Sequence, residues 1–157
     1  MRDGYSNFKF FQCFEPQDLI EGARRTGVAI DIKGYETATI LVNIGDNTGG
    51  GAFTAQWWQA LLEHYNSTAG AWSECYPSQM IGCSVGEAGT FSVLYSGMWF
   101  SFGSADQSAV IAVGYKGPHR TIRVAFSDVN AASTMSIGAV AVLGLPANWP
   151  INTPAGD

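Results

Sequence analysis

Apolar and polar residues alternate at every second position over much of the chain from residue 28 onward. In residues 38–44, Ala, Ile, Val and Ile alternate with Thr, Leu and Asn, and residues 30–33 show a shorter version of the same pattern. A period of two is typical of a strand with one buried face. The sequence therefore predicts strands at 30–33 and 38–44, joined by a tight connection at Gly34-Tyr35.

Four later segments continue this reading, at residues 90–102, 109–115, 120–127 and 134–143. The Lys-Gly-Pro turn at 116–118 predicts a hairpin between the second and third of them. The last segment, TMSIGAVAVL, is almost wholly small or apolar. We expect it to be buried on both faces or covered by a partner.

Other segments are less decided. Residues 53–62 (FTAQWWQALL) are long enough for a helix, but their aromatic residues and the glycines before them favour a strand. Residues 72–75 are a short strand candidate, and the glycine-rich residues 45–51 predict a long turn. Residues 80–89 contain too many Gly and Ser to assign.

Seven or eight short strands about ten residues apart, without a convincing long helix, predict an all-β fold, a β-sandwich or jelly roll. The chain of 157 residues is long enough for one such domain. We place the domain at residues 28–145. Residues 1–27 and 146–157 lie outside the strand pattern, so we expect extended N- and C-terminal arms that lie on a surface.

Charged residues make up only 13% of the chain, about half the usual share, which suggests that neighbours cover much of the surface. From Gly34 to Tyr115 there are six acidic residues and no Lys or Arg. Because phosphate contacts need clustered basic residues, we expect no nucleic-acid partner. No apolar run approaches a membrane span, and the first residues lack the order of a signal peptide, so we expect synthesis in a cytosol and no membrane contact.

One string resembles a catalytic motif. Residues 82–86 (GCSVG) fit the G-x-S-x-G nucleophile elbow around Ser84, and Asp106 and His119 follow in the order of a triad. That motif needs a strand before it and a helix after it in an α/β fold, whereas strand-like sequence follows here. We therefore predict no enzyme activity, with a small hydrolase as an alternative.

Metal and cofactor sites are not indicated either. The three cysteines, Cys13, Cys75 and Cys83, form no metal-ligand pattern and are interpreted as buried small residues. His64 and His119 lie beside predicted turns, where we expect them to be solvated. The triple glycine at 49–51 lacks the Lys and Ser/Thr of a phosphate loop. We expect no metal ion and no bound cofactor.

The aromatic residues suggest contact with a partner. Trp57 and Trp58 are adjacent, so on a strand one points to the core and the other to a surface or interface, and Trp99 repeats this arrangement. A protein partner explains such residues better than a stacked sugar, although a carbohydrate-binding module is an alternative. The candidate interface residues are Tyr5, Phe8, Phe10, Phe11, Phe14, Trp58, Trp99 and Trp149.

Three stretches resemble a known family: the opening Met1-Arg2-Asp3, residues 29–36 (AIDIKGYE) and residues 137–144 (IGAVAVLG). They look like small tailed-bacteriophage proteins that decorate or cement the head. The likeness covers both ends of the domain, while the Trp-rich middle is not specific.

The resemblance implies a virion protein, made in the host cytoplasm, that binds the major capsid protein lattice and ties capsomers together against the pressure of the packaged DNA. It implies a symmetric oligomer and no catalytic residues. The low charge and high aromatic content also predict a homo-oligomer, for which we expect a trimer. A tail or baseplate component of the same virion is the alternative within this class.

Overall fold

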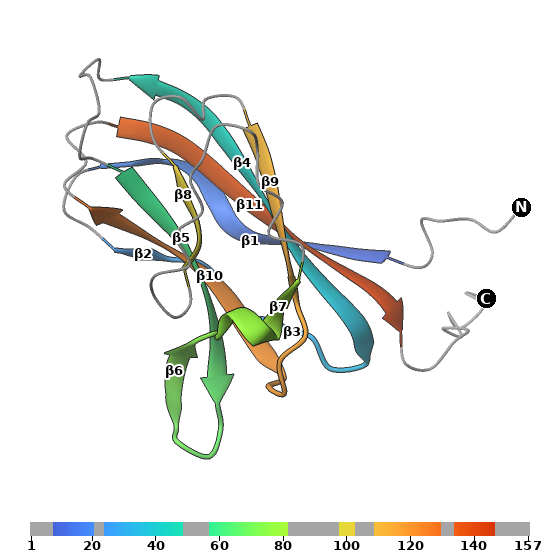
Figure 1. The fold of residues 1–157 in the computed structure, drawn as a ribbon. Coiled ribbons are helices and arrows are strands. Elements are labelled where there is room, and N and C mark those ends of the chain that lie inside the picture. Colours follow the sequence, from blue (N-terminus) through green and yellow to red (C-terminus); the bar gives the residue numbers. More distant parts are fainter. Residues whose placement is uncertain are drawn as a thin grey trace, which may run out of the picture.

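A computed structural model of the chain describes residues 8–20, 24–48, 57–81, 98–102, 109–129 and 134–146. These residues form eleven strands and a single 3₁₀ turn, η2 (Pro77–Gln79), without an α-helix (Figure 1). The strands are β1 (Phe8–Leu19), β2 (Arg25–Thr26), β3 (Ile30–Asp31), β4 (Tyr35–Thr48), β5 (Trp57–Asn66), β6 (Ala71–Glu74), β7 (Met80–Ile81), β8 (Met98–Phe102), β9 (Ala109–Tyr115), β10 (Thr121–Val129) and β11 (Thr134–Pro146).

The strands form two antiparallel sheets. Sheet A has the order β1-β11-β4-β9-β7. Sheet B has the order β2-β10-β5-β6, with β3 also paired to β10 and β8 also paired to β5. Successive strands alternate between the sheets at almost every connection, which is the wrapping of a jelly roll. The all-β sandwich expected from the sequence is confirmed. The strands outnumber the seven or eight predicted, partly because β2 and β3 share one side of β10, and β6 and β8 share one side of β5.

The core lies between the two sheets and explains the period of two. In β4, Ala38, Ile40, Val42 and Ile44 are buried, and the residues between them point to the opposite face. Alternate residues of β11 and β10 complete the two inner faces: Met135, Ile137, Ala139, Ala141 and Leu143, and Ile122, Val124 and Phe126.

The expectation of an N-terminal arm is wrong for residues 8–19. They form β1, which pairs with β11 from Phe8↔Gly144 to Leu19↔Met135. Irregularities in this pairing between Gln12 and Phe14, and again between Phe14 and Gln17, shift the phase of the strand. Cys13 and Phe14 are consequently both buried although they are adjacent. These irregularities remove the alternation of apolar and polar residues by which a strand is recognised in sequence. The remaining parts of the predicted arms, residues 1–7 and 147–157, lie outside the described residues.

The predicted hairpin between residues 109–115 and 120–127 is also wrong. Both segments are strands, but β9 pairs with β4 and β7 in sheet A, whereas β10 pairs with β5 in sheet B. The Lys-Gly-Pro turn therefore carries the chain across the sandwich. A short turn alone does not distinguish a hairpin from a crossover, because the choice depends on the strands with which each segment pairs elsewhere in the chain.

Three smaller predictions can be compared with the structure. Residues 57–66 form β5, which confirms a strand in place of a helix for residues 57–62; residues 53–56 lie outside the described part. β4 continues to Thr48 because it still pairs with β11 there, so the turn predicted at 45–51 begins later than expected. The tight connection at Gly34 is confirmed, with the left-handed φ of 85° that favours glycine.

Candidate functional site

The structure separates the aromatic residues predicted to form an interface. Phe8 and Phe10 are 47% and 55% exposed on β1, while Phe11 is partly buried against the core. Trp99 lies on β8, which pairs with β5, but its side chain is outside what the structure describes. Tyr5 and Trp149 lie outside the described residues.

Phe14 and Trp58 are corrected to core residues. Their exposed fractions are 2% and 1%, and the Phe14 ring packs edge-on against Phe126 with 4.7 Å between ring centroids. Phe14 is turned inward by the irregularity in β1, and Trp58 lies at an inward position of β5, in line with Ala60 and Leu62. These two side chains are therefore not available to a partner in this conformation.

The outer face of sheet A is the candidate functional surface. The pairing registers of sheet A align residues in rows across the strands. One row runs Phe10–Val142–Thr39–Gly114–Ile81, from β1 through β11, β4 and β9 to β7. The neighbouring rows are Phe8–Gly144–Thr37, Gln12–Val140–Leu41–Ala112 and Gly138–Asn43–Val110.

None of the residues in these four rows carries a charge. The rows also contain five of the eight large hydrophobic residues found exposed in the described part of the chain: Phe8, Phe10, Ile81, Val110 and Val140. A sheet face left to solvent normally carries polar and charged side chains. A continuous uncharged face of this kind is typical of a surface that another protein covers.

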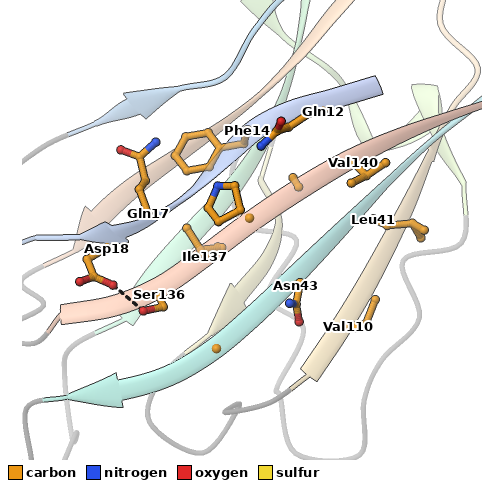
Figure 2. Close-up of a pocket in the computed structure, with 14 residues that line it drawn as sticks. Gln12, Phe14, Gln17, Asp18, Leu41, Asn43, Val110, Ser136, Ile137 and Val140 are labelled. Atoms are coloured by element: carbon orange, nitrogen blue, oxygen red, sulfur yellow. Dashed lines mark hydrogen bonds between the residues drawn. The ribbon is translucent and has the colours of Figure 1, made fainter. Parts of the chain in front are cut away.

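Two hollows mark this outer face. A groove of about 840 Å³ crosses β11 and β4 between β1 and β9, with Val140, Leu41, Asn43 and Val110 along it (Figure 2). At its end, Ser136 donates a hydrogen bond to Asp18, which places a charge at the margin of the face. A second hollow of about 380 Å³ lies toward the other end, where its lining includes Thr37, Thr39, Ile81, Gly114 and the charged Glu36 and Lys116.

Two outer-face glycines let large side chains lie flat. A Cβ atom on Gly144 would stand 2.8 Å from the Phe8 ring, and one on Gly138 would stand 3.3 Å from the Pro16 ring. Both neighbours belong to β1. The face is therefore low and smooth where β11 runs beside β1.

A second cluster lies inside the sandwich, near the turn before β10. His64 is only 4% exposed, and its Nδ1 lies 3.2 Å from the Tyr115 hydroxyl and 3.5 Å from the Cys75 sulfur. The His119 ring packs on the His64 ring with 4.2 Å between centroids. The expectation that His64 is a solvated turn residue is wrong, because it occupies an inward position of β5.

Burial sets the protonation of this cluster. Burial and then the neighbouring His119 lower the pKa of His64 from its ordinary 6.5, so the ring is neutral at pH 7. Burial raises the pKa of Tyr115 to about 12. Burial, and then the Glu63 carboxylate, raise the pKa of Cys75 to about 12. His64, Tyr115 and Cys75 therefore form a neutral, packed set at pH 7.

Glu63 anchors a third cluster, on the outer face of sheet B. Its two carboxylate oxygens contact two arginines, Arg24 through Oε1 at 2.5 Å and Arg123 through Oε2 at 2.7 Å. The guanidinium of Arg123 also lies over the Trp72 ring, 4.0 Å from its centroid. Sequence reasoning missed this cluster, since residues 63 and 123 are brought together only by the pairing of β5 with β10, and Arg24 precedes β2, which also pairs with β10.

The remaining sequence candidates are distributed as follows. Ser84, Asp106 and Cys83 lie outside the described residues, so the G-x-S-x-G string is not placed. Cys13 and Cys75 are buried and free, as expected. Among the residues that the structure describes, no group of three or more His, Cys, Asp or Glu is placed to hold a metal ion. The described part also contains no helix that is long and apolar enough to cross a membrane.

In comparisons with known proteins, no protein-family model matches this chain and no curated protein matches it.

Proposed function

We propose that this chain is a structural protein of a tailed-bacteriophage particle, which decorates and cements the head by binding the major capsid protein lattice. The observation that carries a structural role is the uncharged outer face of sheet A, with its exposed Phe, Val and Ile side chains. A surface of this kind favours association with protein over solvation.

The assignment to a phage head depends on the resemblance of residues 29–36 and 137–144 to head decoration proteins. The first stretch runs from β3 in sheet B into the start of β4 in sheet A, and the second lies in β11, which pairs with β4. The resemblance thus involves strands of both sheets. Jelly rolls serve many functions, so the fold by itself does not favour a virion over another assembly.

A carbohydrate-binding role receives less support from the described residues. Trp58 would have to lie in an open groove to stack on a sugar, but it is buried in the core. One face of Trp72 is occupied by Arg123. The exposed aromatic residues Phe8 and Phe10 lack the hydroxyl or indole N–H that helps to orient a sugar.

The test is direct. Purified chain is mixed with phage heads that lack it, the heads are pelleted, and electron cryomicroscopy locates the added density. We expect saturable binding at symmetry-related positions on the head. Absence of the folded protein from heads at saturating concentration would contradict the proposal, and density on the tail or baseplate would replace the head assignment.

A further inference from the structure

We propose that two copies of this chain pack sheet A against sheet A about a two-fold axis that runs along β4. In this arrangement Phe10 of each copy packs against Ile81 and Gly114 of the other, beside the hollow over β4 and β9. The inference rests on the proposed structural role and assigns a second copy as the partner of the outer face of sheet A, so that the contact with the capsid lattice is made by other surfaces of the dimer.

Charge is the first argument for a second copy. The chain has a formal net charge of −5, so two copies repel each other over most orientations. The four rows of the outer face contain no charged residue, which makes this face a place where like-charged copies approach without facing charges. A partner recognised by charge complementarity would require charged groups in these rows, whereas a second copy does not.

The size of the face is the second argument. The fifteen residues of the four rows, with strands about 4.8 Å apart and rows about 6.6 Å apart, give a projected area of roughly 480 Å². The accessible area of a corrugated face exceeds its projection, which brings it close to the about 600 Å² per partner at the lower end of specific interfaces. The face is therefore large enough for a dimer of modest affinity.

The third argument is the arrangement of projections and hollows along one row. β4 is the middle strand of sheet A, with β1 and β7 at opposite edges. A two-fold axis along β4 keeps each row opposite itself and exchanges its two ends. Phe10 of one copy is then placed over Ile81 and Gly114 of the other, and the same contact occurs a second time by symmetry.

The hollow matches this placement. Thr39, Gly114 and Ile81, which belong to the same row as Phe10, contribute to its lining. The lining also includes Glu36 and Lys116, which lie outside the four rows. Gly114 and the threonines keep that end of the face low, while Phe10 is 55% exposed at the opposite edge. Such an interface is isologous and closes as a dimer, so the proposal replaces the trimer expected from the sequence.

Two measurements test the inference. The first is sedimentation equilibrium of wild type and of Val140→Lys, which puts a charge at the centre of the face. We expect the wild type to become dimeric within a concentration series that reaches about 100 µM, since interfaces of this kind reach micromolar affinity. Val140→Lys should weaken the dimer at least tenfold. The matched control is Val28→Lys, because Val28 is 60% exposed and belongs to none of the four rows; it should leave the dimer unchanged.

The second measurement is cross-linking of Phe10→Cys combined with Ile81→Cys, in a Cys83→Ser background. Within one chain these residues are four strands apart, about 19 Å. Between copies the two-fold axis brings them opposite each other at the about 10 Å spacing of packed sheets, which is too wide for a disulfide. A bismaleimide reagent that spans about 10 Å should therefore give a covalent dimer. The control pair, Val28→Cys with Ile81→Cys, should give none.

Three results would each overturn the inference. The first is a wild-type monomer throughout this concentration range, and the second is a trimer. The third is a dimer that Val140→Lys does not weaken, although the variant remains folded by circular dichroism. Its failure is separable from that of the proposed function. A monomer that still binds heads contradicts only the sheet-to-sheet dimer, whereas a dimer that behaves as expected but never binds heads contradicts only the head assignment.

Discussion

Arg123 of β10 lies directly opposite Glu63 of β5 and donates a hydrogen bond from Nε to the Glu63 carboxylate at 2.7 Å. Glu63 is 5% exposed, and its second oxygen is held by Arg24. A carboxylate so far from water depends on both arginines, because its hydration has been replaced by their N–H groups.

Arg123→Met should therefore lower the free energy of unfolding by about 2 kcal/mol, the range for a hydrogen bond to a buried charged group. The change is measured by urea unfolding at pH 7. The control is Arg120→Met, since Arg120 forms an exposed pair with Asp31 and water replaces the lost contact. Equal effects of the two substitutions would show that burial of Glu63 is not what makes the Arg123 contact matter.

Stability should fall as the pH drops below about 6.5, because of His64. Its pKa is lowered in the folded protein, so the unfolded chain binds more protons in this range. The stabilisation is complete above the ordinary value of 6.5 and is lost as the pH falls toward the folded-state pKa. Urea unfolding at about pH 7.5, 6.5 and 5.5 measures this slope. His64→Leu should reduce it, whereas an unchanged slope would assign the effect to other groups, with His119→Ala testing the ring stacked on His64.

Two phenylalanines of β1 should respond differently to truncation. Phe14→Ala should destabilise the protein by about 3–5 kcal/mol, since it opens a cavity beside Phe126. Phe10→Ala should change stability by less than about 0.5 kcal/mol, because the side chain is more than half exposed. Thermal unfolding of both variants decides the matter, and a large loss from Phe10→Ala would mean that this residue supports the fold and not only a surface.

The two described cysteines should resist thiol reagents. Burial raises the pKa of Cys13 and of Cys75 to about 12, so thiolate is scarce at pH 8. Mass spectrometry after iodoacetamide treatment should find both unmodified in the native protein and modified in denaturant. Rapid native labelling of Cys75 would show that the loop after β6 opens readily.

The sequence predicted most of β4, β9, β10 and β11, because each of these strands keeps one face in the core over its whole length. It did not predict β1, where an extra residue at Cys13 places two adjacent side chains inside. The distinction between Phe10 and Phe14 depends on that irregularity, so the composition of residues 8–14 could not reveal it. The signal for the outer face was present at the odd positions of residues 37–43, which are all uncharged, but only the strand order makes them neighbours of Val110 and Val140.

The place of β11 in sheet A has a consequence for how the protein folds. β11 is the last described strand to be synthesised, and it occupies the position between β1 and β4. Until it arrives, β1 lacks the strand with which it pairs, and β4 is paired along one edge only. Almost every contact of sheet A thus links residues that are far apart in sequence, a topology associated with folding in milliseconds to seconds. During this interval the nascent chain exposes the edges of β1 and β4, so chaperone demand and aggregation in vivo should depend on how quickly β11 inserts.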